Sequence, residues 1–242
     1  MRLNLTIPVY NEERSLRQNM TRLHVFLSQH FRLDREIVIA DNGSTDKTLE
    51  IAQSLARELP HVRVIHSSEK GRGGALKRAW LESDADILSY MDADLSTEIE
   101  AFPRLIAALV TDGYDLATGS RLLNPALTKR SVKREVTSQC YNRLVKALLR
   151  THFSDAQCGF KAITRPAARH LLPMVEDNGW FFDTELLVIG EKLGYRVYDL
   201  AVRWVENPST RVRVVRTALE DLKGLIRVWW SIRCGRLPRF RR

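Results

Sequence analysis

Two aspartates, Asp92 and Asp94, stand one residue apart where an apolar run over 85–91 ends. Carboxylates this close repel each other, so the pair calls for a cation. Oxygen ligands at an exposed strand end suit a hard divalent ion such as Mg²⁺ or Mn²⁺, which keeps part of its coordination shell for water and substrate phosphates. The pair therefore predicts a metal that bridges phosphates. The alternative interpretation is a plain strand-end turn, in which Asp is common.

A metal held at this point would act on the phosphate side of a substrate. As a Lewis acid, it would neutralise the charge that grows on a diphosphate leaving group and fix that group in place. A nucleotide-sugar donor fits this chemistry, because cleavage between its sugar and its diphosphate releases a nucleoside diphosphate. Two further polar clusters, over 10–12 and 41–43, each follow an apolar segment. They are candidates for holding the base and the ribose.

Hydrophobic periodicity predicts strands and helices in alternation through the first half of the chain. We expect strands over 3–9, 36–41, 63–67 and 86–92, and helices over 11–30, 45–59, 73–83 and 98–113. The GSTD segment at 43–46 is expected to cap the helix that follows it. Alternation of this kind is typical of a parallel α/β sheet, in which ligands bind beyond the carboxyl ends of the strands. The polar clusters are therefore expected to meet at one edge of the sheet.

The second half of the chain has a more mixed pattern, but its length and composition still indicate one large domain. We expect a strand over 114–121, a mobile loop over 122–135, helices over 136–150, 165–175 and 178–194, and a strand pair over 195–206. The chain has 242 residues, of which 44% are hydrophobic, so it can bury a full core. The prediction is one α/β domain over 1–210, with a mixed, mostly parallel sheet flanked by helices.

The remaining composition bears on the compartment. The three cysteines, Cys140, Cys158 and Cys234, are far apart and include no CxxC pair. This spacing argues against a disulfide framework or a zinc site and fits a reducing compartment. No secretory signal pattern is visible, and no run approaches about 18 uninterrupted apolar residues. We expect a cytoplasmic protein.

The basic charge of the chain is concentrated in its tail. Residues 211–242 contribute +8 of the formal net charge of +9. A nucleic-acid-binding protein with a basic tail is one interpretation. It leaves the acidic strand ends unexplained, and aromatic and basic residues do not interleave on the body as stacking platforms require. No nucleic-acid partner is therefore expected.

The tail itself predicts an amphipathic helix over 212–232. Its apolar residues recur at three- and four-residue steps: Val215, Ala218, Leu219, Leu222, Ile226 and Trp229. Basic residues lie between them, so the helix and the tail, together 211–242, suit an anionic membrane surface. Packing against the domain, against a second subunit or against a membrane-embedded partner is the alternative.

Eight segments in register resemble a known family. In the first half, IPVYNEE, ADNGSTD, EKGRGGAL, MDADLS and TGSR resemble the inverting GT-A glycosyltransferases of family 2. In the second half, DAQCGFKAIT, NGWFFDTELL and VRWVENPSTRV resemble the polyprenyl-phosphate sugar synthases, above all dolichyl-phosphate glucose synthase, with dolichyl-phosphate mannose synthase more distant. The resemblance covers roughly 3–230 and implies a GT-A, Rossmann-like fold with a C-terminal amphipathic helix.

The resemblance also implies roles for individual residues on the donor side. The residues implied to hold the donor are Pro8, Tyr10, Glu12, Asp41, Lys70, Gly71, Asp92 and Ala93. Asp92, Asp94 and Ser96 are implied near the metal, which would be Mg²⁺ or Mn²⁺. The nearby glycines 71, 73 and 74 are expected either to form a turn before a helix or to let the backbone approach the donor. They are not a phosphate-binding P-loop, because GxxxxGK[ST] is absent.

On the acceptor side, basic residues match those that bind a phosphate in the relatives. Arg121 is implied near the donor diphosphate or at the acceptor phosphate, and Arg134 and Arg211 at the acceptor phosphate, with Arg130 and Lys133 nearby. The guanidinium fork suits phosphate recognition. A solvated charged loop is the alternative. Asp94 and Arg121 are the candidates for catalysis. Asp183 and Glu185 could bind sugar hydroxyls, orient an arginine or cap a helix.

The predicted function is transfer of a sugar from a nucleotide diphosphate sugar, with a UDP-sugar favoured, to a polyprenyl phosphate. The expected location is the cytoplasmic face of a membrane, with a membrane-embedded partner or a second copy as further candidate partners. The alternatives are a GDP-mannose-dependent mannose synthase and a glycosyltransferase with a soluble glycan acceptor. A phosphate oxygen is already an anionic nucleophile, so no general base is assigned.

Overall fold

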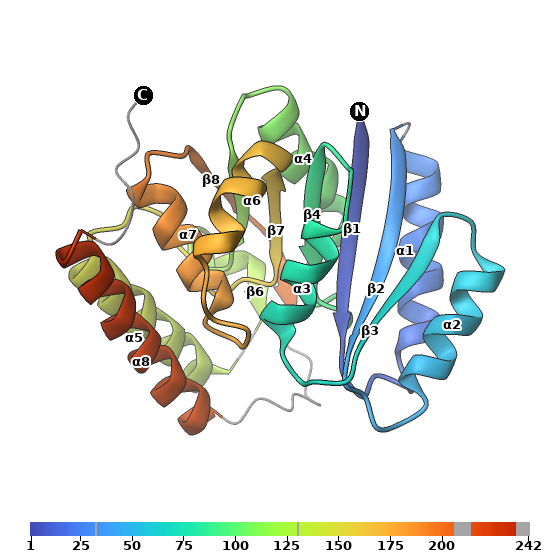
Figure 1. Ribbon diagram of the computed structural model, residues 1–242, viewed down its shortest axis with the longest axis horizontal. Coiled ribbons are helices and arrows are strands. Elements are labelled where there is room, and N and C mark those ends of the chain that lie inside the picture. The colour runs from blue at the N-terminus through green and yellow to red at the C-terminus, as the bar shows by residue number, and fades with distance from the viewer. Residues whose placement is uncertain (32, 130, 206–213, 236–242) are drawn as a thin grey trace.

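A seven-stranded mixed sheet forms the centre of the molecule, in a computed structural model that describes residues 1–31, 33–129, 131–205 and 214–235 (Figure 1). The strand order is β3-β2-β1-β4-β7-β5-β8. Its strands are β1 Arg2–Val9, β2 Asp34–Asn42, β3 Val62–Ser67, β4 Ile87–Met91, β5 Leu116–Ser120, β7 Phe160–Thr164 and β8 Val197–Ala201. Only β7 runs antiparallel to its neighbours within this sheet. The predicted mixed, mostly parallel sheet is confirmed.

Helices cover both faces of the sheet. One face packs against α1 (Leu16–His30), α2 (Thr48–Glu58) and α4 (Phe102–Val110). The other face packs against α3 (Arg72–Leu81), α6 (Arg165–Leu171) and α7 (Phe182–Lys192). Beyond α7, two long helices lie side by side, α5 (Val132–Leu149) and α8 (Val214–Arg233) (Figure 1). Three short 3-10 turns complete the helical elements: η1 Ile99–Ala101, η2 Pro125–Leu127 and η3 Leu172–Met174.

The central strands are almost entirely buried because both faces of the sheet are covered. In β1, Leu5 and Ile7 face the cluster formed with α1 and α4, and both are at most 1% exposed. In β2, Val38 points to the opposite cluster and is fully buried. Each such side chain contributes about 1.5–3 kcal/mol to folding through burial. This core fixes the edge at which the polar clusters are placed.

Several element boundaries differ from the sequence-based expectations. The first helix begins at Leu16 rather than at residue 11, because Asn11 adopts φ 56° and takes part in a loop. The helix expected from residue 45 begins at Thr48, with Lys47 at its N-cap position; the Asp46 carboxylate nevertheless accepts the Thr48 amide at 2.9 Å. The expected helix over 98–113 is a 3-10 turn followed by α4.

Two expectations for the second half were wrong. One was a continuous loop over 122–135, and the other was a pair formed by the two strands over 195–206. The segment 122–135 is not a continuous loop, because it contains η2, the two-residue strand β6 (Thr128–Lys129) and the first turn of α5. The two strands expected to pair over 195–206 form but do not pair with each other. β8 lies parallel to β5, whereas β9 (Trp204–Val205) lies parallel to β6.

Helix α8 packs on the domain with a face that the sequence pattern did not predict. Gly224 lies so close to Phe181 that an added Cβ would stand 2.3 Å from its ring. Leu225 and Val228 are buried with it, and the Gln157 side chain donates to Asp221 at 2.8 Å. Burial raises the pKa of Asp221 to about 7.

The predicted apolar stripe of α8 instead faces outward for most of its length. Leu219, Leu222 and Ile226 are 57%, 43% and 49% exposed, and Ala218 is also exposed. Trp229, the last member of that stripe, is half-buried. The side chain of Val215 lies outside the described part. Every helix within the described ranges is too short or too polar to cross a membrane.

Candidate active site

The carboxyl ends of six strands meet at one edge of the main sheet, the lower edge in Figure 1. These strands are β1, β2, β3, β4, β5 and β8. Because β7 runs in the opposite direction, the segment that leads into it, 155–159, reaches the same edge. The polar clusters after β1, β2 and β4 are thus brought together, as the strand–helix alternation predicted. The arrival of 155–159 beside them was not predicted.

The aspartate pair is held in a tight turn after β4. The Leu95 amide donates to Asp92 O at 3.1 Å, and Leu95 adopts φ 51°. The Ser96 amide donates to Asp94 Oδ1 at 3.0 Å. The Ala93 carbonyl accepts from the side chain of Asn19 at 2.9 Å. The turn is therefore fixed at three points, which leaves the two carboxylates at the strand end.

Gly159 lies directly against this turn. The Asp92 amide donates to Gly159 O at 3.1 Å. A Cβ added to Gly159 would stand 1.9 Å from Asp92 Oδ2 and 2.4 Å from Oδ1. No rigid side chain fits there, so a glycine is required for Asp92 to keep its position.

Arg72 joins the aspartate pair to a buried carboxylate on α7. Its Nη2 donates to Asp92 Oδ1 at 2.9 Å, and its Nη1 donates to Asp183 Oδ2 at 2.6 Å. Its side chain is 10% exposed and stacks between the rings of Tyr90 and Trp180, at 4.9 and 5.1 Å from their centroids. The Tyr90 hydroxyl also donates to Asp183. Burial and the charge of Asp183 raise the pKa of Tyr90 well above its ordinary value, so the hydroxyl keeps its proton.

The glycines around Arg72 serve close packing between α3 and the segment before α7. A Cβ at Gly71 would stand 2.8 Å from Asn178 O, and one at Gly73 would stand 2.6 Å from Phe182 Cβ. The Gly74 amide donates to Asn178 O at 3.0 Å. Close packing against this segment thus explains glycine at 71 and 73, whereas a Cβ at Gly74 would make only ordinary contacts. Approach of the backbone to the donor stays a prediction.

The residues predicted to hold the base and ribose of the donor lie at this edge, and most of them already contact other groups of the protein. Asp41 is 1% exposed, and its Oδ2 lies 2.7 Å from Nδ1 of His66, which lies in β3. The Lys70 ammonium lies 3.9 Å from the ring centroid of Tyr10. Pro8 is buried in β1 beside this group. The Glu12 carboxylate accepts the Ser15 hydroxyl at 2.8 Å and so supports the start of α1.

Arg121 is fixed by an acid that the sequence did not single out. Its Nε and Nη2 donate to Asp155 Oδ2 and Oδ1 at 2.7 and 2.9 Å, and its amide also donates to Oδ2. Asp155 is fully buried, whereas the Arg121 side chain is 14% exposed. Burial opposes ionisation of this carboxyl, but Arg121 holds its pKa at about 2. The guanidinium also lies 5.7 Å from the Trp204 ring centroid. The pair therefore presents a preorganised cation at the carboxyl edge.

The two acids of FFDTELL have protein partners. Asp183 is 2% exposed; burial opposes its ionisation, but Lys161 and Arg72 lower its pKa. Glu185 accepts the amides of Glu176 and Asp177 and a 2.9 Å bond from Arg227 of α8. Of the roles weighed for these acids, orienting an arginine agrees with the contacts of both, and binding of sugar hydroxyls stays a prediction. Asp177, rather than either acid, accepts the first amide of α7, at 3.1 Å from Phe182 N.

The predicted acceptor residues are only partly described. Arg134 is half-buried in the first turn of α5. Arg130 and Arg211 lie outside the described residues, as does the side chain of Lys133. The strand β6 just before α5 pairs with β9, and Val205 of β9 donates to Ser96 O at 2.9 Å. The loop that carries the basic residues is thus tied to the turn that carries Asp94.

The side-chain oxygens at the aspartate turn fit a metal that takes its other ligands from substrate phosphates. They do not form a complete metal site by themselves. Among the described residues, no group of three or more His, Cys, Asp or Glu side chains could hold a metal. Asp92 and Asp94 offer two carboxylates, and the Asp92 side chain is 40% exposed. Mg²⁺ and similar ions are commonly held by one or two carboxylates and substrate phosphates. The role of Ser96 as a ligand stays a prediction.

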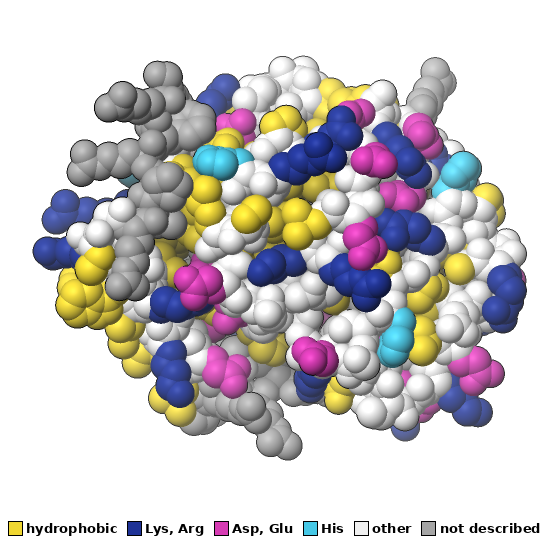
Figure 2. Space-filling model, in the orientation of Figure 1, with side chains coloured by type: hydrophobic (Ala, Val, Ile, Leu, Met, Phe, Trp, Pro, Cys, Tyr) yellow, Lys and Arg dark blue, Asp and Glu magenta, His cyan; other side chains and the backbone are white. Residues whose placement is uncertain are grey.

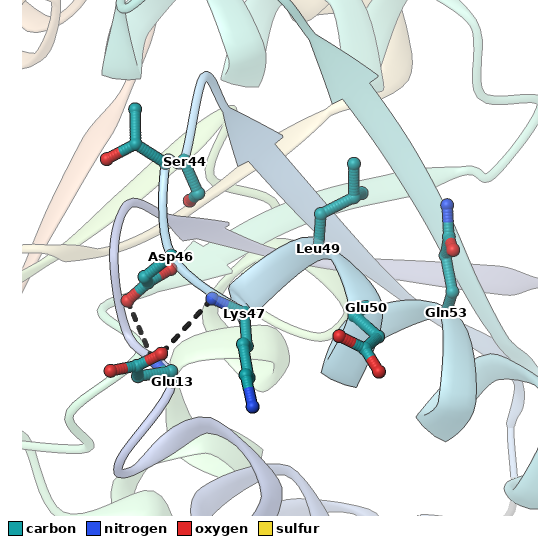
Figure 3. A pocket seen from close by; sticks show the side chains of 8 residues that line it. Glu13, Ser44, Asp46, Lys47, Leu49, Glu50 and Gln53 are labelled. Carbon is teal, nitrogen blue, oxygen red and sulfur yellow. Dashed lines mark hydrogen bonds between the residues drawn. The ribbon is translucent and has the colours of Figure 1, made fainter.

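A shallow hollow of about 530 Å³ lies outside this site, at the start of α2 (Figure 3). Glu13, Asp46 and Lys47 line it, together with Leu49 and Glu50. Two amides at this helix start are already bonded within the protein. Lys47 N donates to Glu13 Oε2 at 3.1 Å, as Figure 3 shows, and Thr48 N donates to Asp46 Oδ1 at 2.9 Å.

Four residues of the site were missed by reasoning from sequence. Arg72, Asp155, Gly159 and Lys161 hold Asp92, Arg121 and Asp183 in place. All four lie inside EKGRGGAL or DAQCGFKAIT, the segments that carry the family resemblance. The signal was present, but the segments alone do not say which residues face one another.

Sequence comparison finds glycosyltransferases among the relatives of this chain. The chain is similar to the glycosyltransferase AglD of Haloferax volcanii, with 40% identity over 233 residues, which cover 95% of this chain and 37% of that protein. It is also 28% identical to a dolichyl-phosphate beta-glucosyltransferase of Dictyostelium discoideum, over 93% of this chain and 73% of that protein. It is 31% identical to dolichyl-phosphate beta-glucosyltransferase ALG5A of Trichomonas vaginalis, over 88% of this chain and 68% of that protein. The chain thus spans little more than a third of AglD and about 70% of the other two relatives.

Solved structures support the fold. Glucosyl-3-phosphoglycerate synthase from Mycobacterium tuberculosis, in complex with UDP, superposes with a TM-score of 0.69 at 20% identity, covering 98% of this chain and 80% of that one. Its complex with Mn²⁺, UDP and phosphoglyceric acid gives a TM-score of 0.65. The expected GT-A fold class is confirmed. The profile of the family described as Glycosyl transferase family 2 matches residues 5–172, and the chain therefore belongs to glycosyl transferase family 2.

Proposed function

We propose that this protein transfers a sugar from a nucleotide diphosphate sugar, with a UDP-sugar favoured, to a polyprenyl phosphate, with inversion at the anomeric carbon. The observation that carries the proposal is the turn that holds Asp92 and Asp94 at the carboxyl edge, beside the fixed guanidinium of Arg121. The names of two relatives, which are dolichyl-phosphate beta-glucosyltransferases, support the acceptor. A structural neighbour in complex with Mn²⁺ and UDP-glucose supports the donor.

In this reaction an oxygen of the acceptor phosphate attacks the anomeric carbon, and the bond from that carbon to the diphosphate breaks. The acceptor oxygen is anionic, so the protein has to position it and stabilise the leaving group rather than remove a proton. Asp92 and Asp94 would hold Mg²⁺ or Mn²⁺, which supplies Lewis-acid stabilisation of the leaving diphosphate when bound. Arg121, already oriented by Asp155, would face the diphosphate or the incoming phosphate. Tyr10, Asp41 and Lys70 would hold the nucleoside.

A transfer assay tests this proposal directly. Purified protein is incubated with a short polyprenyl phosphate, Mn²⁺ or Mg²⁺, and a panel of radiolabelled UDP- and GDP-sugars, and label is followed into the organic phase. We expect label from one UDP-sugar, its loss on chelation of the metal, and its return when the metal is restored. Label from GDP-mannose instead would overturn the donor assignment. Label that reaches only a soluble glycan, or no label from folded protein in the presence of membranes, would overturn the lipid acceptor.

We further propose that α5 and α8 present an apolar platform to a membrane surface. The platform consists of side chains that are each 40–57% exposed: Val136, Leu144 and Leu148 of α5 and Leu219, Leu222, Ile226 and Trp230 of α8. Figure 2 shows hydrophobic side chains gathered along the left edge of the molecule, where Figure 1 has these two helices. Exposed basic residues of the same helices, such as Arg143, Lys146 and Lys223, would favour anionic lipid.

The platform predicts binding to lipid vesicles through named side chains. Replacing Leu222 and Ile226 together by glutamate is expected to weaken sedimentation with phosphatidylglycerol vesicles at least about tenfold, because apolar contact is lost and two like charges meet the surface. The matched control is Val110→Glu, at an exposed valine of α4 on the other side of the sheet. Equal binding by the double variant and the control would contradict the platform. Loss of binding accompanied by a changed molecular mass in solution would indicate a second copy as the occupant instead.

A further inference from the structure

Arg72 forms an ion pair with Asp92 in the structure. The guanidinium forks between two carboxylates, with 2.9 Å to Asp92 and 2.6 Å to Asp183, so it is bound to one acid that faces the site and to one that does not. The Asp92 side chain is 40% exposed, whereas that of Asp183 is 2% exposed. Arg72 therefore sits at the boundary between the core and the candidate metal site.

The position of Arg72 is fixed by packing rather than by its ion pairs alone. It begins α3, whose glycines on either side press against Asn178 and Phe182. Its side chain is enclosed by the rings of Tyr90 and Trp180. The guanidinium therefore cannot swing far into solvent when another cation approaches Asp92. It can release one of its two bonds and keep the other.

A divalent ion at the aspartate turn would compete with this guanidinium. Asp92 would have to give up the Arg72 bond, and the metal would then lie near a positive charge in a partly enclosed place, where like charges repel more strongly than in water. Within the described part of the chain no group of three or more acidic, histidine or cysteine side chains could hold an ion, so the two aspartates alone would not balance the combined charge of the ion and of Arg72. A nucleoside diphosphate adds the missing negative charge and the missing oxygen ligands.

We infer that Arg72 is the resident counter-ion of Asp92 and that a metal displaces it from that carboxylate only together with the nucleoside diphosphate. Metal binding is thereby made dependent on the donor. Arg72 keeps Asp183 during the exchange, since that bond is the more buried of the two. The inference rests on the metal–diphosphate site proposed above, and it adds a residue that sets the order of binding.

Mn²⁺ titration followed by the electron paramagnetic resonance signal of the free ion tests this inference without any sugar transfer. An opposite charge at this distance commonly shifts a carboxylate equilibrium by one to three powers of ten. We therefore expect Arg72→Gln to bind Mn²⁺ alone at least about tenfold more tightly than the wild type, and to gain less from added UDP. The control is Arg78→Gln, on the same helix, where the arginine is bonded to Glu82 at 2.8 Å and is exposed. It changes the net charge equally and should bind Mn²⁺ as the wild type does.

Two further results keep the test decisive. Glutamine can still donate to Asp183, which also retains Lys161 at 3.5 Å and the Tyr90 hydroxyl, so the fold should survive. Arg72→Lys keeps the charge and should keep the weak, UDP-dependent binding of the wild type. Equal Mn²⁺ affinities for Arg72→Gln and Arg78→Gln, or weaker binding by Arg72→Gln, would overturn the inference alone. Absence of Mn²⁺ binding by every variant, with and without UDP, would overturn it together with the proposed metal–diphosphate site.

Discussion

Replacing Gly159 by alanine is expected to lower the rate of sugar transfer about a thousandfold while the protein stays folded. The added Cβ would stand 1.9 Å from Asp92 Oδ2, so the carboxylate has to leave its position and its bond to Arg72. Loss of a carboxylate proposed to hold the metal would remove several kcal/mol of transition-state stabilisation, and each 1.36 kcal/mol is a factor of ten in rate. The Asp92 side chain is 40% exposed, so it can turn into solvent without opening the core.

The matched control for this substitution is Gly74→Ala. A Cβ at Gly74 would meet its nearest atom, Asn178 Cβ, at 3.5 Å, which is ordinary contact. Gly74 lies within α3, where alanine is favoured over glycine by up to about 1 kcal/mol, so this variant should keep its activity and its stability. Both variants are compared in the transfer assay, with circular dichroism and a thermal melt to confirm folding.

A double variant separates displacement of Asp92 from damage elsewhere. If Gly159→Ala acts through the aspartate pair, then combining it with Asp94→Ala should lower the rate little further than Asp94→Ala does alone, because residues that act as a unit are not additive. Full activity of Gly159→Ala would show that Asp92 does not have to occupy its observed position. Independent, multiplicative losses would show that Gly159 acts through some other part of the molecule.

The sequence predicted the edge of the sheet well and the contacts behind it poorly. Tyr10 and Asp92 directly follow buried strands, and Asp41 lies at the end of another, so parallel strands place them at one edge by geometry alone. Hydrophobic periodicity does not predict the direction in which β7 runs. Because β7 is antiparallel, it brings Asp155 and Gly159 to that edge from a distant part of the chain, and no local pattern indicates this.

The C-terminal helix illustrates the same limit. A three- and four-residue recurrence indicates an apolar stripe but does not say whether the stripe faces the domain or the outside. In α8 the domain accepts the side that carries Gly224, because only a glycine allows the helix to approach the ring of Phe181. The stripe with Leu222 and Ile226 is left exposed. The sequence therefore indicated the helix correctly but not which of its faces is buried.

Replacing Asp155 by asparagine is expected to lower the free energy of unfolding by about 3–5 kcal/mol, since it leaves the guanidinium of Arg121 enclosed without a counter-charge. Asp155 is fully buried and accepts three bonds from Arg121, two of them from the guanidinium. An isosteric amide can accept a hydrogen bond through its one oxygen only. Urea unfolding of both proteins at pH 7 measures the difference. The control is Glu82→Gln, which breaks an exposed ion pair with Arg78 and should cost less than about 0.5 kcal/mol.

The same pair predicts how the stability depends on pH. The pKa of Asp155 is about 2 in the folded protein and 3.8 as a free side chain, so ionisation favours the folded state. This stabilisation, of order 2 kcal/mol, is fully present above about pH 4 and is lost as the pH falls through 2. Wild type and Asp155→Asn should therefore differ most at neutral pH, and their difference should shrink by about 2 kcal/mol toward pH 2, because protonation removes the charge that asparagine also lacks. A difference in unfolding free energy that stays constant from pH 7 to pH 2 would show that packing, and not the Arg121 ion pair, accounts for the loss of stability.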